Sequence, residues 1–386
     1  MQASRGSVLG SLSTDDFLAR YWQKQPCLVR GALPGFQSFI SKQLLFALSM
    51  EGSVESRLVL ERGGEMPWEV IHGPQDPDDL AHLPDSDWTL LVQNVDLHRR
   101  EAAELLRRFR FIPDWRIDDL MISIAPAGGS VGPHLDSYDV FLLQAGGRRR
   151  WQINRDDYTE DDFIPGLDLR ILADFRPQEE WVLEPGDMLY LPPGVAHHGV
   201  ALDECLTCSI GFRAPSRQEL LHHYLDDALE EYGDETYRDP DLVSQESSAE
   251  ITAAARSRLR ALMQTHFLDE AVLDRWFGRY VTRLPDQIAI TPPPQLDKSA
   301  FASLCAQASG LRCHHTCRTV FMRRESDFIL FVNGEAYTVP GEHADFVKAL
   351  TETRKLEPTQ LRDYAGYTVT AAILRDLYNR GLLHEV

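Results

Sequence analysis

The first 215 residues carry short, mainly apolar runs separated by turn-forming residues, a pattern typical of β-structure. One run, residues 188–191, lies between the turn signals Glu184-Pro185-Gly186 and Pro192-Pro193-Gly194. Apolar and β-branched runs bounded by glycine and proline predict strands. The predicted strands cover residues 121–124, 140–143, 151–153, 188–191 and 206–212. We therefore expect a β-barrel in this part of the chain.

Beyond Pro215 the apolar positions follow a helical period. Residues 218–232 predict one helix, and the capping-box sequence Ser247-Ser248-Ala249-Glu250 predicts the start of another. The second helix would carry one apolar stripe, formed by Ile251, Ala255, Leu259 and Leu262. A third helix follows Leu268 and has a broad apolar face, formed by Leu273, Trp276, Phe277, Tyr280, Val281 and Leu284.

The part after Pro292-Pro293-Pro294 mixes helices with a small hairpin and resembles a winged-helix domain. Helices are predicted at residues 299–307, 344–352, 358–364 and 371–380, and strands at residues 319–322 and 328–332. The candidate recognition helix, residues 368–380, carries only Arg375 and Arg380 as bases, so we expect a protein-binding or scaffolding role. The predicted domains are residues 1–215, 216–291 and 292–386.

Composition is ordinary for a globular enzyme, with 43% hydrophobic and 25% charged residues in 386. No apolar run reaches the length of about 18 residues that spans a membrane, and the residues after Met1 do not resemble a signal peptide. Six cysteines in so long a chain favour reduced thiols. We expect a soluble, cytoplasmic protein that does not bind membranes.

The net charge of −20 limits the possible partners. Such a surface repels nucleic-acid phosphates, so direct nucleic-acid binding is not expected, whereas a strongly basic protein would be attracted. Nearly half of this excess negative charge lies in residues 226–250, which hold ten acidic residues and one basic residue. This stretch fits either a solvated surface or a docking site for a basic protein.

The chemistry of the chain is indicated by His134 and Asp136, followed 63 positions later by His197. Two imidazoles and one carboxylate in this order are the ligands of a facial triad, which holds Fe(II) and leaves positions for a co-substrate and oxygen. In a strand, residues i and i+2 share one face, so His134 and Asp136 could reach one ion. The sequence therefore predicts an iron site.

Two flanking segments support this prediction. The glycine-rich residues 128–133 let the backbone approach closely before His134, and Gly146-Gly147 leads through three arginines into a strand at Trp151. A guanidinium near the triad suits the distal carboxylate of 2-oxoglutarate, because it can bind a carboxylate through two hydrogen bonds.

Two cysteine pairs suggest zinc less strongly. Cys205 and Cys208 are three apart in a predicted strand and would face opposite ways, which is poor geometry for chelation. Cys313-His314-His315-Thr316-Cys317 holds four possible ligands, which lie too close together in sequence for a tetrahedral site without a second pair. We interpret this sequence as a surface cluster, and zinc binding there stays open.

Over residues 14–215 the chain resembles the bacterial ribosomal oxygenases. These are JmjC-type cupin enzymes similar to the arginine hydroxylase of large-subunit ribosomal protein sixteen. The resemblance is carried by residues 17–26, by 111–151 with Gly132-Pro133-His134-Leu135-Asp136, and by Gly211-Phe212-Arg213-Ala214-Pro215. It implies a double-stranded β-helix (cupin/JmjC jelly roll), then a helical dimerisation domain, then a winged-helix-like domain.

The resemblance also implies the roles of individual residues. His134, Asp136 and His197 would bind Fe(II), with His198 as the competing third ligand, and Arg149 would bind the tail carboxylate of 2-oxoglutarate. Alternation alone would put Arg148 and Arg150 together on the opposite face. Ser209 could contact the co-substrate or be a small core residue.

The implied activity is hydroxylation of an arginine C3 on a basic ribosomal protein of the large subunit, with 2-oxoglutarate, Fe(II) and O2, by a homodimer. Asp118 or Asp139 is our candidate for pairing with the target guanidinium. Histidyl hydroxylation, N-methyl removal, a cupin metalloprotein without 2-oxoglutarate, and a non-catalytic adaptor remain alternatives.

Overall fold

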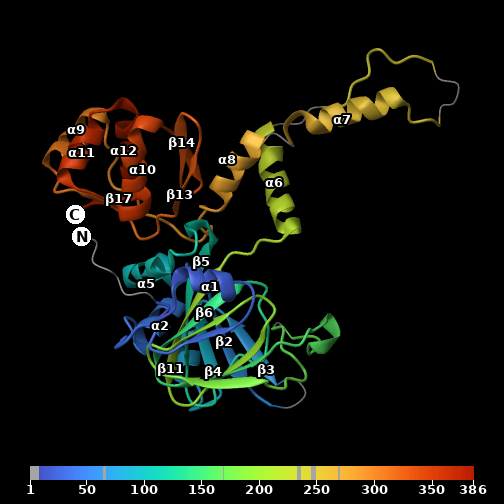
Figure 1. The fold of residues 1–386 in the computed structure, drawn as a ribbon, viewed down its shortest axis with the longest axis vertical. Coiled ribbons are helices and arrows are strands. Elements are labelled where there is room, and N and C mark those ends of the chain that lie inside the picture. Colours follow the sequence, from blue (N-terminus) through green and yellow to red (C-terminus); the bar gives the residue numbers. More distant parts are fainter. Residues whose placement is uncertain (1–7, 64–66, 168, 233–235, 245–248, 268–269) are drawn as a thin grey trace. The chain divides into compact units, whose positions relative to one another are not determined.

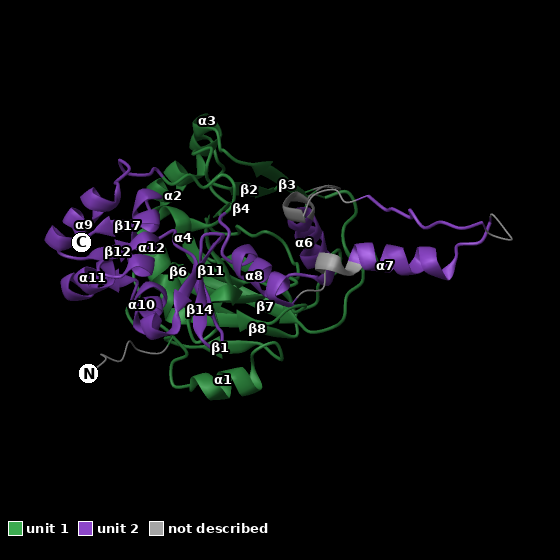
Figure 2. Cartoon of the chain, turned by 90° about the horizontal axis from the view of Figure 1, so that it is seen from above, with its two compact units in different colours: residues 1–214, 285–290 green, residues 215–284, 291–386 purple. Residues whose placement is uncertain are grey.

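The computed structural model describes residues 8–63, 67–167, 169–232, 236–244, 249–267 and 270–386. The chain forms two compact units, shown in different colours in Figure 2. The first unit comprises residues 1–214 and 285–290, and the second comprises residues 215–284 and 291–386. The predicted end of the first domain at residue 215 lies next to this boundary. Division of the remainder at residue 291 stays a prediction.

The first unit is built on two facing antiparallel sheets (Figure 1). The large sheet has the strand order β1-β9-β6-β11-β5-β4-β2-β3, and the small sheet has the order β10-β7-β8. The strands are β1 (Cys27–Val29), β2 (Ser56–Glu61), β3 (Trp68–His72), β4 (Trp88–Val92), β5 (Ile117–Ala125), β6 (Asp139–Gly146), β7 (Arg149–Asn154), β8 (Glu179–Leu183), β9 (Met188–Leu191), β10 (Ala196–Ala201) and β11 (Cys205–Phe212). Each of the five strands predicted from the apolar runs is therefore present.

Short helices cover the outer face of the large sheet. They are α1 (Thr14–Arg20), α2 (Lys42–Ser49), α4 (Val95–His98) and α5 (Arg100–Leu106); the unit also contains α3 (Pro77–Ala81). Phe17 of α1, Leu45 of α2 and Leu105 of α5 are buried with strand residues such as Phe141 and Ile210 in the main core. The opposite face of the large sheet is thereby left to face the small sheet, as alternating strand residues require.

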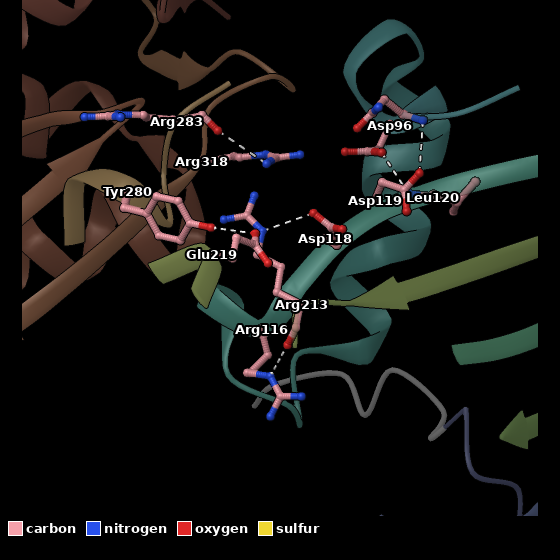
Figure 3. Close-up of polar contacts among 11 residues, drawn as sticks. Asp96, Arg116, Asp118, Asp119, Leu120, Arg213, Glu219, Tyr280, Arg283 and Arg318 are labelled. Carbon is pink, nitrogen blue, oxygen red and sulfur yellow. Dashed lines mark hydrogen bonds and ion pairs between the residues drawn. The ribbon is translucent and has the colours of Figure 1, made fainter. Parts of the chain in front are cut away.

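A buried ion pair fixes the start of β6. Asp139 is fully buried and accepts hydrogen bonds from Tyr190 Oη at 2.6 Å, Gln23 Nε2 at 2.9 Å and Arg116 Nη2 at 3.2 Å. Arg116 Nε also donates to the Arg213 carbonyl oxygen at 2.7 Å (Figure 3). Asp139 is thus a structural residue, and its predicted pairing with a substrate is wrong, because three donors already surround it.

The second unit contains the helical segment and the C-terminal part. Its helices are α6 (Arg217–Tyr232), α7 (Ala253–Phe267), α8 (Glu270–Tyr280), α9 (Lys298–Gln307), α10 (Ala344–Lys348), α11 (Pro358–Ala365) and α12 (Thr368–Asn379). Its strands are β12 (Leu311–Cys313), β13 (Thr319–Arg323), β14 (Asp327–Val332), β15 (Glu335–Pro340), β16 (Lys355–Leu356) and β17 (Leu383–Glu385). The strands form the sheets β16-β12-β17 and β13-β14-β15, of which only β13 and β14 were predicted.

Helix α8 packs against α6 in this unit. The Trp276 ring contacts the Tyr224 ring with centroids 5.1 Å apart, and Trp276 Nε1 donates to Asp227 Oδ2 at 2.7 Å. Tyr280 Oη donates to Glu219 Oε1 at 2.9 Å (Figure 3). On the broad apolar face of α8, the Trp276 side chain is therefore covered by α6 of the same chain.

Helix α7 begins later than its sequence suggested. The predicted capping residues Ser247 and Ser248 lie outside the described residues, and the helix starts at Ala253. The Thr252 hydroxyl accepts a hydrogen bond from the Ala255 amide at 3.2 Å, as an N-cap does. None of the described helices is both long and apolar enough to cross a membrane.

Candidate metal and co-substrate site

A cavity of about 310 Å³ lies between the two sheets of the first unit. Side chains from β2, β4, β5, β6 and β11 line one side, and Arg149 and Trp151 of β7 with His197 of β10 line the other. His134 and Asp136 also line it, so the predicted triad and the predicted arginine share one space.

Backbone pairing brings the two histidines of the triad together. His134 and His197 form an isolated antiparallel bridge, with N–H···O distances of 3.0 Å from His134 and 2.7 Å from His197. Their rings lie 4.3 Å apart between centroids, and His197 Nε2 is 3.7 Å from Asp136 Oδ2. Outside this bridge, residues 134–138 form no regular strand, contrary to the prediction.

The three side chains can share one metal ion. One ligand atom from each of His134, Asp136 and His197 lies within 4.8 Å of the others. Nδ1 of His134 is 2.9 Å from the Gly132 carbonyl oxygen, and Nδ1 of His197 is 3.0 Å from that of Val195. Because a carbonyl only accepts hydrogen bonds, each Nδ1 carries the proton, and each Nε2 presents a lone pair.

Burial prepares His197 for metal binding. It lowers the pKa of His197 to about 4, and the neighbouring His134 contributes in the same direction. The ring is therefore neutral at physiological pH, as a metal ligand must be.

His198 follows His197 on β10 and its ring faces elsewhere. It stands edge-on to Phe175, with centroids 6.0 Å apart, and it does not line the cavity. Successive strand residues point to opposite faces, which explains why the two neighbours differ. The geometry therefore favours His197 as the third ligand.

Arg149 is the one arginine of its run that lines the cavity. Arg148 is exposed and pairs with Asp203 at 2.9 Å, and Arg150 lies 3.9 Å from Glu180. Arg149 is buried, its Nη2 donates to the Gly199 carbonyl oxygen at 3.2 Å, and its Nη1 lies 3.5 Å from Ser123 Oγ. In the described part of the chain, Nε of Arg149 has no hydrogen-bond partner and no carboxylate pairs with the group.

The absence of a carboxylate partner for Arg149 among the described residues indicates that the guanidinium binds an anionic ligand. Burial lowers the pKa of Arg149, which expresses the cost of holding a cation away from water. A ligand carboxylate would remove that cost. Gly199 makes room for the guanidinium, because a Cβ there would lie 2.8 Å from Arg149 Nε and 2.6 Å from the Trp151 ring.

An acidic residue that the sequence analysis missed lies towards the other end of the cavity. Asp119, Met121 and Ser123 are alternate residues of β5, and all three line the cavity. Ser123 lies beside Arg149, so Asp119 is about 13 Å further along the strand, at 3.3 Å per residue. The same alternation, applied from Met121, would have selected Asp119 rather than Asp118.

Asp118 lies on the other face of β5. It is half-exposed and accepts a hydrogen bond from Arg213 Nε at 3.1 Å (Figure 3). It does not line the cavity, so the structure does not support its predicted pairing with a substrate. Ser209 is buried on β11 and does line the cavity; its contact with the co-substrate stays a prediction.

The cysteine pairs lie elsewhere. Cys205 and Cys208 are buried on β11, and neither lines the cavity. Cys313 and Cys317 are also buried, with Cys317 Sγ 3.2 Å from the Leu382 carbonyl oxygen, so their interpretation as a surface cluster is wrong.

Comparison with known proteins identifies the family. The JmjC domain family matches residues 104–220, and the ROXA-like winged-helix family matches residues 259–384. The ribosomal protein uL16 3-hydroxylase of Escherichia coli (strain K12) is 40% identical over 284 residues, which are 73% of this chain and 75% of the relative. The chain belongs to the JmjC-type ribosomal oxygenases.

Other members of this family are also similar to this chain in sequence and in structure. A probable ribosomal oxygenase of Haemophilus influenzae is 40% identical over 211 residues, or 54% of this chain and 52% of the relative. The crystal structure of E. coli YcfD has a TM-score of 0.84 at 35% identity and covers 97% of this chain and 99% of its own. Another YcfD structure, with cobalt and 2-oxoglutarate, has a TM-score of 0.81 at 35% identity and covers 97% and 98%. The predicted fold class, a JmjC cupin domain followed by helices and a winged helix, is confirmed.

A metal titration distinguishes His197 from His198. We expect His197→Ala and His134→Ala to weaken Co(II) binding at least about a hundredfold, because each removes a direct ligand. Losing a residue that only orients a ligand already weakens metal binding by about ten- to hundredfold. His198→Ala is the control and should bind Co(II) like the parent protein, as measured by visible absorption. Loss of Co(II) binding only in His198→Ala would show that His198, and not His197, is the third ligand.

The arginine run provides a matched test of the co-substrate site. We expect Arg149→Met to weaken 2-oxoglutarate binding by about 2–5 kcal/mol, because one partner of a buried charge pair is removed. Arg150→Met makes the same change on the exposed face and should leave the affinity unchanged. Calorimetric titration of the Co(II)-loaded proteins measures both. Equal affinities in the two variants would contradict the assignment.

Proposed function

We propose that this protein is a 2-oxoglutarate- and Fe(II)-dependent hydroxylase that modifies C3 of an arginine in ribosomal protein uL16. The observation that carries this proposal is one cavity with a triad of metal-ligand type, a buried unpaired guanidinium beside it, and a carboxylate towards the opposite end. The similarity to a uL16 3-hydroxylase supports uL16 as the substrate, and the Haemophilus relative supports a ribosomal target.

In this proposal His134, Asp136 and His197 hold the iron by one face. Bound iron, together with 2-oxoglutarate and dioxygen, would supply the oxidising power to hydroxylate a carbon atom, which amino-acid side chains cannot do by themselves. Arg149 binds the distal carboxylate of 2-oxoglutarate and fixes its orientation. Trp151, whose ring centroid lies 5.2 Å from Arg149 Cζ, packs beside the guanidinium and excludes water from it.

The target arginine would enter from the end of the cavity that Asp119 occupies. Its guanidinium would hydrogen-bond to the Asp119 carboxylate, which holds the side chain extended towards the metal ligands. Tyr138 lies on the same wall, and burial, followed by the charges of Asp136 and Asp119, raises the pKa of Tyr138, so its hydroxyl stays protonated. A carboxylate here favours an arginine over a neutral histidine target.

Mass spectrometry tests the activity directly. Purified uL16 incubated with the enzyme, Fe(II), 2-oxoglutarate and O2 should gain the mass of one oxygen atom on one arginine. Asp119→Asn should raise KM for uL16 about ten- to hundredfold, since a hydrogen bond to a charged group contributes about 1.5–3 kcal/mol, and should leave 2-oxoglutarate binding unchanged.

The control is Asp118→Asn, which alters a carboxylate on the outer face and should keep full activity. Oxygen added to a histidine, or loss of a methyl group, would refute arginine hydroxylation and retain the oxygenase class. If no ribosomal protein leads to succinate formation from 2-oxoglutarate, the assignment to the oxygenase class is refuted as well.

We further propose that the protein acts in the cytoplasm as a homodimer paired through α6 and α7. Helix α7 extends away from the rest of its unit in both views (Figures 1 and 2) and exposes 53% of Leu259 and 56% of Met263. A single helix of this length is marginal in water, so a covering partner would stabilise it. A two-fold pair is the commonest symmetric solution. The acidic residues 226–250 would then occur twice and attract a basic substrate.

Light scattering tests this pairing. We expect the parent protein to be a dimer at micromolar concentration and the Leu259→Glu/Met263→Glu variant to be a folded monomer, because buried charges would oppose association. Ser257→Glu places a charge on another face of α7 and should remain dimeric. A monomeric parent protein would exclude the pairing.

A further inference from the structure

The C-terminal part of the chain lacks the strongly acidic character of the rest. Residues 298–386 hold eleven lysine and arginine residues against ten aspartate and glutamate residues, although the whole chain carries a net charge of −20. At physiological ionic strength charges are screened beyond about 8 Å, so the local surface decides what binds more than the net charge does. A cluster of bases in this part can therefore bind a polyanion.

Three basic residues form a row across the sheet β16-β12-β17. Arg312 of β12 pairs in register with Lys355 of β16 on one side and with His384 of β17 on the other. The residues that alternate with them are buried and form the inner face of the sheet: Leu311, Leu356, Cys313 and Leu383. Strand alternation therefore places the three bases, which we call the basic row, on the outer face. Neighbouring strands lie about 4.8 Å apart, so the row spans about 10 Å.

This arrangement opposes folding, because like charges directly opposite each other on neighbouring strands repel. Among the described residues, Arg312 forms no ion pair and no side-chain hydrogen bond, and Lys355 pairs with Glu357 at 2.7 Å. That ion pair lies at the surface, where such pairs contribute little stability, so a phosphate can replace the Glu357 carboxylate. Alternation directs Glu385, which pairs in register with Leu311, away from the row.

Histidines extend the basic row beyond the end of β12. The His314 ring lies 6.0 Å from that of His384 and 4.1 Å from that of His315, between centroids. Burial, followed by His315, His384 and Arg354, lowers the pKa of His314 to about 4. The last three contributions have one direction because each of these groups adds positive potential around His314.

We propose that the basic row is a docking site for single-stranded ribosomal RNA. The choice of RNA rests on the proposed function, since an enzyme that modifies a ribosomal protein meets its substrate beside ribosomal RNA. Bases spaced across a sheet match a run of phosphates, and the neighbouring imidazoles can stack on nucleobases. Contacts of this kind depend on salt concentration and little on sequence. The site differs from the candidate recognition helix α12, which carries few bases.

RNA docking would affect uL16 bound to RNA and not the purified protein. A second contact with the same particle raises the effective concentration of the target arginine at the catalytic unit without any new contact to uL16 itself. Purified uL16 offers no RNA, so its hydroxylation does not need the basic row. The dissociation constant expected for RNA alone is about 10⁻⁴–10⁻⁶ M at physiological salt, as for other sequence-independent contacts.

Fluorescence anisotropy tests the inference with a labelled single-stranded RNA of about 12 nucleotides. For the parent protein, the logarithm of the association constant should fall with the logarithm of the salt concentration, with a slope of about −2 for three phosphates. Arg312→Gln should weaken binding about fivefold at 0.1 M salt and reduce the slope by about 0.7. Arg312→Lys keeps the charge and should bind like the parent protein.

Arg375→Gln is the matched control, because Arg375 lies on α12 and also forms no ion pair among the described residues. It should leave the RNA affinity unchanged. The Arg312→Gln and His384→Gln variants should keep or raise the Tm of the parent protein, because repulsion within the row is relieved. All variants should hydroxylate purified uL16 like the parent protein, whereas Arg312→Gln should slow hydroxylation of uL16 bound to a ribosomal RNA fragment.

The outcomes separate this inference from the proposed function. If RNA binds through Arg312 and purified uL16 is not hydroxylated, the proposed function fails and the RNA site stands. If Arg375→Gln weakens RNA binding and Arg312→Gln does not, the RNA binds at α12 and the inference is wrong. Absence of RNA binding by the parent protein at low salt also overturns it. In that case, binding of polyglutamate that Arg312→Gln weakens would assign the row to an acidic protein segment.

Discussion

The pair of backbone hydrogen bonds between His134 and His197 determines the rest of the site. These residues are 63 positions apart, and the bridge fixes the distance between their rings before any metal binds. The carbonyls of Gly132 and Val195 then set both imidazole tautomers. Because the ligand atoms are positioned by the main chain, the metal does not have to order them, which lowers the entropy cost of binding.

The charges along the cavity follow from strand alternation. Asp119, Met121 and Ser123 share one face of β5, so the Asp119 carboxylate and Ser123, the neighbour of Arg149, lie four strand residues apart, or about 13 Å. An anionic co-substrate and a cationic target can therefore bind at opposite ends of one cavity. In the proposed function, the Arg149 guanidinium would favour the anionic co-substrate at one end, and the Asp119 carboxylate would favour the cationic target at the other.

The sequence predicted those site residues whose positions follow from the period of a strand or from a known motif. Alternation placed Arg148 and Arg150 on one face and Arg149 on the other, and the family resemblance selected Arg149. The His-x-Asp spacing identified residues that do lie together. The presence of Arg57 and Gln93 beside Asp119 in the cavity was not predictable, because it requires β2, β4 and β5 to be neighbours, and the period of a strand does not specify strand order. The period of α8 likewise predicted the apolar face that carries Trp276, but it did not specify that α6 covers this side chain.

The residues from His134 to Asp139 show how an irregular segment can be anchored along its length by hydrogen bonds. The bridge to His197 holds its first residue, and the Gly194 amide donates to the Asp136 carbonyl oxygen at 2.8 Å in the middle. Arg116, Gln23 and Tyr190 hold Asp139 at its end. The buried Asp139 network therefore contributes to the site without touching any ligand, since it fixes Tyr138 and Asp136 relative to both sheets.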